Sequence, residues 1–135
     1  MNAKANAEVS YAHRSRIEKL GVKRGHRVLF AGLGDPAFRA EVEHAGAHVS
    51  TRATGEADLI FLGADDRAGL SRLRSLHKNL KRDGAIWVIR PRGSGAISES
   101  DVMAAGKAVG LVDIKVARFS DTHSALKFVI PVSRR

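Results

Sequence analysis

Two glycines and an aspartate, Gly32, Gly34 and Asp35, follow an apolar run in the stretch VLFAGLGDP at residues 28–36. Glycines at this spacing let the backbone pass close to a ligand, and in open α/β proteins ligands bind outside the carboxyl ends of the strands. The complete dinucleotide fingerprint is G-x-G-x-x-G, but here Ala37 stands at the third glycine position. The stretch therefore raises the hypothesis of a nucleotide-like cofactor, with these three residues as its contacts.

The acidic residue that completes such a site is missing. In such sites an acidic residue normally stands at the end of the following strand and holds the ribose hydroxyls. In this chain the following apolar segment ends in Ser50-Thr51-Arg52, so a cation takes the place of the carboxylate. Glu56 is close in sequence but lies in the short link that follows. The alternative interpretation, which we favour, is that the two glycines only form a tight turn and that Asp35 only caps the helix after it.

Asp65 and Asp66 follow the apolar run ADLIFLGA at residues 57–64. Because the carboxyl ends of parallel strands meet at one edge of a sheet, Asp65 could join Gly32, Gly34 and Asp35 in a cofactor site. The competing and favoured interpretation is that both aspartates belong to the cap and first turn of a helix.

Arg90, Arg92 and Ser94 lie in the stretch RPRGSG, which follows a third apolar run. Two guanidinium groups on a glycine-rich loop could grip a phosphate or carboxylate, with the serine hydroxyl assisting. This stretch is our best candidate for an anion site, and a flexible basic surface loop is an equal alternative.

Other chemistries are excluded or disfavoured. The chain has no cysteine, so it forms neither disulfides nor thiolate sites. His44 and His48 are four apart, but Gly46 breaks any helix between them, and we predict no metal site. Neither a G-x-S-x-G nucleophile elbow nor a G-x-x-x-x-G-K-[ST] phosphate loop is present.

The elements that would position these residues follow from apolar periodicity and turn signals. We predict a flexible tail at residues 1–9 and one domain over residues 10–133. Its predicted helices are 10–21 (with Ser10 as N-cap), 36–46, 67–84 and 98–110, and its predicted strands are 27–33, 47–53, 57–64, 85–91, 114–120 and 125–132.

Strands that alternate with helices indicate an α/β fold with a mostly parallel sheet and helices on both faces, and the short turn at 121–124 implies an antiparallel hairpin at the end. That order is typical of a single, trimmed, class I methyltransferase-like Rossmann domain. The link between the strands at 47–53 and 57–64 is too short for a parallel crossover, so a βα unit must be missing there. The first of these strands must then be very short, or the chain must return nearly extended.

The net charge is +9 and the pI about 10.7, which favours acidic partners. The predicted helix 67–84 carries six cations that could bind nucleic acid through phosphate contacts, although a solvated basic face is the commoner case. No segment is apolar enough for a membrane span or a secretory signal, so we expect a cytoplasmic bacterial protein. Together with Lys23, Arg24 and Arg27, the six cations of that helix could form one basic face; the six are Arg67, Arg72, Arg74, Lys78, Lys81 and Arg82.

Three motifs carry a resemblance to a known family: LKRDGAIWVIRP at 80–91, GLVDIKV at 110–116 and DTHSALKFV at 121–129. With the opening KLGVKRGHRVLF, they resemble domain-of-unknown-function family 3052, small bacterial proteins with a methyltransferase-like Rossmann core. The resemblance spans about residues 17–130. His123 stands where the family usually has an aromatic residue, and Ala125 where it usually has glycine. The residues that match the motifs are Asp83, Gly84, Trp87, Val88, Pro91, Gly110, Leu111, Val112, Asp113, Lys115, Val116, Asp121, Ser124, Leu126, Lys127, Phe128 and Val129.

Three functions follow from these patterns. The leading expectation is a non-catalytic binding or interaction module, in which a homo-oligomer could form through the terminal hairpin. The alternative is a small S-adenosylmethionine-dependent methyltransferase, in which Gly32→Asp or Gly34→Asp would abolish cofactor binding and leave the fold intact. The third is nucleic-acid binding through the basic face.

Overall fold

The computed structural model describes residues 15–93 and 95–135. The predicted flexible tail at 1–9, the predicted N-cap Ser10 and the anion-site candidate Ser94 lie outside the described residues. What the structure describes of the first predicted helix is α2 (Arg16–Lys19), which Ser15 caps by accepting a hydrogen bond from the Glu18 N–H.

A six-stranded sheet forms the centre of the protein, in the order β2-β1-β3-β4-β6-β5. Its first four strands are parallel, and β6 pairs antiparallel with both β4 and β5. The α/β fold, the mostly parallel sheet and the terminal hairpin are therefore confirmed. The strands are β1 (Arg27–Ala31), β2 (His48–Ser50), β3 (Ala57–Gly63), β4 (Leu80–Pro91), β5 (Val112–Arg118) and β6 (His123–Val129).

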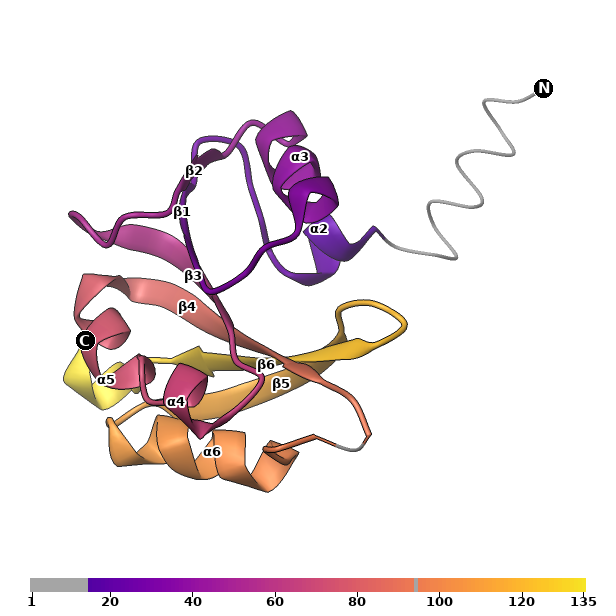
Figure 1. The fold of residues 1–135 in the computed structure, drawn as a ribbon. Coiled ribbons are helices and arrows are strands. Elements are labelled where there is room, and N and C mark those ends of the chain that lie inside the picture. Colours follow the sequence, from indigo (N-terminus) through magenta and orange to yellow (C-terminus); the bar gives the residue numbers. More distant parts are fainter. Residues whose placement is uncertain (1–14, 94) are drawn as a thin grey trace.

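Helices cover both faces of the sheet (Figure 1). On one face, α2 and α3 (Pro36–His44) close a core around Phe38 and Trp87, and the Trp87 Nε1–H donates to the Leu20 carbonyl at 3.0 Å. The other face packs a second core around Ile86 and Phe128. The elements on that face are α4 (Arg67–Leu70), α5 (Leu73–Leu76), η1 (His77–Asn79) and α6 (Glu99–Ala108), and η2 (Val132–Arg134) follows β6.

Two predicted helix starts are present with their caps. The Asp35 carboxylate accepts a hydrogen bond from the Phe38 N–H at 3.0 Å, and Pro36 occupies the first turn of α3, where its missing N–H costs nothing. Ser98 and Asp101 form the reciprocal capping box at the start of α6, with hydrogen bonds of 3.1 and 2.8 Å.

The single helix predicted at 67–84 is wrong. Leu70, Leu73, Leu76 and Leu80 are all buried in one core, but the chain breaks into α4, α5 and η1, and Leu80 already belongs to β4. The Ser71 hydroxyl donates to the Ala68 carbonyl at 2.7 Å, and hydroxyl bonds of this kind compete with the helical backbone ladder. The spacing of these four leucines is typical of one helix and agrees with their burial, but the backbone does not form that helix.

The structure confirms that a βα unit is missing between β2 and β3, within the part of the chain that it describes. A very short strand is followed by a short link back to the sheet. β2 has only three residues, lies at the edge of the sheet and pairs in parallel with β1. Residues 51–56 then bring the chain back to β3 on the far side of β1. Among the residues the structure describes, no helix lies between β2 and β3 in the chain.

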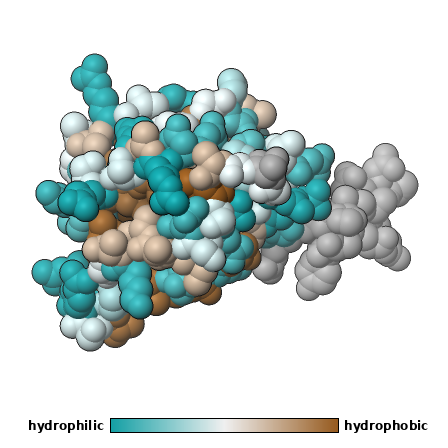
Figure 2. Space-filling model, turned by 60° about the horizontal axis from the view of Figure 1, so that its bottom comes forward, coloured by the Kyte–Doolittle hydropathy of each residue, from teal (hydrophilic) through white to brown (hydrophobic). Residues whose placement is uncertain are grey.

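Apolar residues are also exposed at the other edge of the sheet. Three of the exposed large apolar side chains, Val112, Ile114 and Val116, belong to the edge strand β5, and Met103 belongs to the adjacent α6. Figure 2 brings the α6 side forward and shows brown apolar areas between hydrophilic ones on that face. Self-association through the hairpin stays a prediction.

Candidate functional site

The carboxyl ends of β1, β3 and β4 surround a hollow of about 310 Å³ together with the turn between β5 and β6. Gly32, Gly34, Asp35 and Asp65, the four residues predicted to hold a cofactor, all line it. The structure thus brings together residues that are up to 33 positions apart at the edge where open α/β proteins bind ligands. Leu33, Gly63, Ile89, Phe119, Ser120, Thr122 and His123 complete the lining.

Gly32 is required by packing between strands. Its φ is +65°, and a Cβ built on it would lie 2.9 Å from the Gly63 carbonyl oxygen. A Cβ on Gly63 would in turn collide with the Gly32 carbonyl oxygen. The two strand ends therefore approach so closely that neither position accepts a side chain, and Gly32 has the structural role that the favoured interpretation gave it. Sequence reasoning missed Gly63, its partner.

Gly34 is in a different situation. It is exposed, its φ is not positive, and a Cβ there would meet nothing within 4 Å. Neither strain nor packing explains a glycine at this position. Its missing side chain keeps the backbone at the start of α3 open towards the hollow.

The two aspartates differ as well. Asp35 is half-buried and its Oδ1 is engaged in capping α3. Asp66 caps α4 by accepting from the Gly69 N–H at 2.9 Å, so the capping role predicted for the pair falls on Asp66. Asp65 is exposed, and its side chain makes no hydrogen bond within residues 15–93 and 95–135. Its carboxylate is therefore available to the hollow.

The turn before β6 adds a titratable group that sequence reasoning did not place in the site. The Oγ1 of Thr122 lies 2.8 Å from Nδ1 of His123, and the Ser120 hydroxyl accepts from the His123 backbone N–H at 3.1 Å. The Thr122 contact engages Nδ1 of the imidazole, and no hydrogen bond to Nε2 exists among the described residues. The ring therefore has a polar atom available to a molecule in the hollow.

The predicted anion-site arginines do not line this hollow. Side chains alternate along β4, so Arg90 points to the face opposite Ile89, and its Nη1 donates to the Pro91 carbonyl at 2.9 Å. Arg92 is exposed, and its backbone N–H donates to the Thr122 carbonyl. An anion site on this loop stays a prediction.

The basic residues do not form one helical face, because the predicted helix is broken. Arg67 pairs with Asp101 at 3.3 Å, and Lys81, now on β4, pairs with Asp58 at 3.1 Å. Arg72 reaches the end of β1, where its Nη1 would lie 3.3 Å from a Cβ on Gly32. Nucleic-acid binding stays a prediction, and the continuous helix that suggested it is absent.

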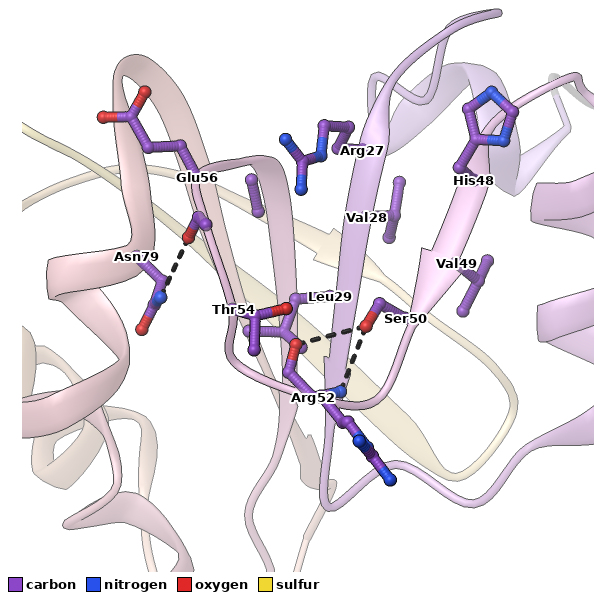
Figure 3. Close-up of a pocket in the computed structure, with 12 residues that line it drawn as sticks. Arg27, Val28, Leu29, His48, Val49, Ser50, Arg52, Thr54, Glu56 and Asn79 are labelled. Carbon is purple, nitrogen blue, oxygen red and sulfur yellow. Dashed lines mark hydrogen bonds between the residues drawn. The ribbon is translucent and has the colours of Figure 1, made fainter.

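A second hollow, of about 190 Å³, lies where the crossover is shortened (Figure 3). Its floor comes from β1 and β2, and residues 51–56 form its rim. The Asn79 side chain donates to the Gly55 carbonyl at 2.9 Å, and Ser50 Oγ bonds the backbone of Arg52 at 3.1 Å (Figure 3). No carboxylate stands at the end of β2, so the ribose anchor is missing from the structure as it is from the sequence.

The structure describes no cluster of three metal-ligating side chains in residues 15–93 and 95–135. Within the same residues no helix is both long and apolar enough to cross a membrane.

Several solved structures share this architecture at low sequence identity. A TehB-like SAM-dependent methyltransferase from Corynebacterium glutamicum has a TM-score of 0.57 at 17% identity, over 96% of each chain. A SAM-dependent methyltransferase from Aquifex aeolicus has a TM-score of 0.67 at 13% identity, over 86% of this chain and 88% of that one. The chain has the class I methyltransferase fold.

A third similar structure is CalO1, a methyltransferase in calicheamicin biosynthesis that is described in its SAH-bound form. It has a TM-score of 0.63 at 17% identity and covers 91% of this chain and 54% of its own. No protein-family model matches the chain, and no curated protein matches it in sequence. At these identities the likeness establishes the fold, and membership of family 3052 stays a prediction.

Proposed function

We propose that this protein binds S-adenosylmethionine in the hollow at the carboxyl ends of β1, β3 and β4 and transfers its methyl group to an acceptor. The observation that carries the proposal is that Gly34 and Asp65 line this hollow without a structural reason for their residue types. The fold supports it, because the solved structures that share it include SAM-dependent methyltransferases.

The residues present suit the methionine half of the cofactor. The open backbone at Gly34 allows a ligand to approach the start of α3 closely. The carboxylates of Asp35 and Asp65 favour the positively charged amino and sulfonium groups. When bound, the cofactor would supply an electrophilic methyl group. His123 lies in the same hollow and can accept the proton that an O–H or N–H acceptor loses.

The adenosine half of the cofactor has fewer suitable partners in this chain. A carboxylate that accepts ribose hydroxyls contributes about 1.5 to 3 kcal/mol through charged hydrogen bonds, and this chain has none at the end of β2. We therefore expect binding about ten- to a hundredfold weaker than in a site with that anchor.

Calorimetric titration with S-adenosylmethionine and S-adenosylhomocysteine tests the proposal. Gly34→Asp should lower the affinity at least about tenfold, because it adds bulk to the open backbone beside the hollow. Its free energy of unfolding should stay within about 0.5 kcal/mol of the wild-type value, since the added side chain meets nothing. The matched control is Gly95→Asp, the same change in the loop after β4 and outside the hollow.

Two results would contradict the proposal: no binding of either compound at millimolar concentration, or equal loss of affinity in the control variant. The substitution Gly32→Asp, which the sequence suggested as an equivalent test, is not a clean one. Its side chain would strain the backbone and collide with Gly63, so a loss of binding would not separate site from fold.

The second candidate function is a non-catalytic binding module. The observation that favours it is the shortened crossover, which removes the structure that would hold an adenosine. This candidate predicts that a ligand binds in the hollow and that no methyl group leaves S-adenosylmethionine. Incubation with methyl-labelled cofactor and a cell extract of candidate acceptors separates the two functions.

A further inference from the structure

Lys127 lies on the central part of β6 between two cross-strand neighbours. Trp87 of β4 pairs with it on one side and Lys115 of β5 on the other. Side chains of directly paired residues stand on the same face of a sheet, about 5 Å apart at their Cβ atoms. Two like charges therefore stand side by side, which is unfavourable unless something compensates for it.

No carboxylate compensates for this pair in the described residues. Neither lysine side chain has a hydrogen bond or an ion pair within residues 15–93 and 95–135. The Lys127 Nζ lies 5.6 Å from the centre of the Trp87 ring, a contact that stabilises an ammonium less than a carboxylate does. Burial, and then the charge of Lys115, hold the pKa of Lys127 below its usual value.

Lys127 also lines a hollow of about 350 Å³ at the amino ends of the strands, opposite the proposed methyl-transfer site. Lys23 and His26 contribute further basic groups to it, and Asp83 and Asp58 are its acidic residues. Asp58 is already neutralised, because it pairs with Lys81 at 3.1 Å and accepts the Arg27 backbone N–H at 2.8 Å. The hollow therefore offers space beside the Lys127 amine, and Lys23 supplies a second cation in its lining.

We propose that Lys127 is a nucleophilic lysine that captures a small carbonyl compound bearing an anionic group. A lysine is activated as a nucleophile when it is partly desolvated or lies next to another cation, and Lys127 meets both conditions. The anionic group is assigned because two lysines have no carboxylate partner among the described residues: Lys115, which pairs with Lys127 across the strands, and Lys23, which lines the same hollow.

The reaction balances without a further reagent. The neutral Nζ attacks the carbonyl carbon, the C–N bond forms, and the carbonyl oxygen takes up a proton to give a carbinolamine. Loss of this oxygen as water, with the remaining proton of the amine, leaves an imine. The step consumes one amine and one aldehyde and releases one water, and hydrolysis reverses it.

Reductive trapping tests the proposal independently of methyl transfer. The full-length protein is incubated with 4-formylbenzoate and cyanoborohydride at pH 7.5, and the labelling rate of each lysine is measured by peptide mass spectrometry. Lys127 should be labelled at least about fivefold faster than the exposed Lys107 of α6, and its rate should level off at a lower pH. Lys127→Arg, which keeps the charge, should remove only this fast labelling.

Two variants and a second aldehyde test why Lys127 is labelled fast. Lys115→Met should slow the labelling of Lys127 about threefold, whereas the matched control Lys107→Met should leave it unchanged. Methyl 4-formylbenzoate, the neutral counterpart, should label Lys127 more slowly than 4-formylbenzoate. Labelling of Lys127 no faster than that of Lys107 would overturn the nucleophilic role. Equal rates with the two aldehydes would overturn the assignment of an anionic ligand.

Discussion

The β1–α3 region and the region from β2 to residue 56 show what trimming a fold keeps and what it removes. In the first, a strand end, a glycine turn and a capped helix surround one side of a hollow. In the second, a three-residue strand and a short link replace a crossover and leave no carboxylate at the strand end. The difference indicates that the part of the site for the methionine half of the cofactor and the part for the adenosine half depend on separate elements. One part can therefore be present without the other.

The largest expected effect concerns the glycine contact that closes the first region. Gly32→Asp should destabilise the protein by about 2 to 3 kcal/mol, because the residue has a φ of +65° and its Cβ would lie 2.9 Å from the Gly63 carbonyl oxygen. Urea denaturation of this variant beside Gly34→Asp measures the contrast. If both variants unfold at the same urea concentration, the two glycines do not have the separate roles assigned to them.

The second prediction concerns the ribose anchor that is missing at the end of β2. Arg52→Asp places a carboxylate just after β2 and should raise the affinity for S-adenosylhomocysteine about tenfold, through hydrogen bonds to the ribose. Arg52→Gln, which only removes the charge, is the matched control. Calorimetry that gives equal affinities for the two variants would mean that the end of β2 does not reach the ligand.

The third prediction concerns how the link is held. Asn79→Ala removes the side-chain donor to the Gly55 and Ala53 carbonyls, which lie 2.9 and 3.3 Å from Nδ2. We expect a loss of about 1 kcal/mol and faster amide hydrogen exchange confined to residues 51–56. Exchange that increases equally in α3 would show that the two regions are not independent.

The smallest expected effect is a pH dependence at the start of β3. Burial raises the pKa of Asp58, but the Arg27 N–H and the Lys81 ammonium outweigh it, so the pKa lies below its ordinary value. The stabilisation is therefore complete above the pKa of the unfolded chain, about 4, and is lost as the pH falls below it. It should amount to at most about 1 kcal/mol.

Urea midpoints of the wild type and Asp58→Asn between pH 3 and 7 measure this dependence. The difference in stability between the two proteins should shrink as the pH falls below 4. A difference that stays constant over the whole range would contradict the role of the Asp58 carboxylate.

Much of the fold follows from local rules. The cap Asp35 and the covered strands β3 and β4 were predicted, and a very short β2 was one of two alternatives left open, because each depends on neighbouring residues or on chain length. The break of the helix predicted at 67–84 was not, because serine hydroxyl bonds and the pairing of Leu80 with Ala57 decide it.

The candidate site divides in the same way. Gly32, Gly34, Asp35 and Asp65 were found because strand ends of a parallel sheet converge. Gly63 and His123 were missed, since the first matters only through contact with Gly32 and the second enters through a turn at the far end of the hairpin. A glycine directly after the apolar run of β3 was the one signal for Gly63.

The most direct test of the proposed site is to map amide chemical shifts by NMR while S-adenosylmethionine is added to the wild-type protein. We expect the shifts to change at residues 32–35, 63–65 and 120–123, around the hollow at the carboxyl ends of the strands. Unchanged shifts at millimolar cofactor would contradict it. Shifts confined to residues 48–57, around the hollow beneath the link, would contradict it equally.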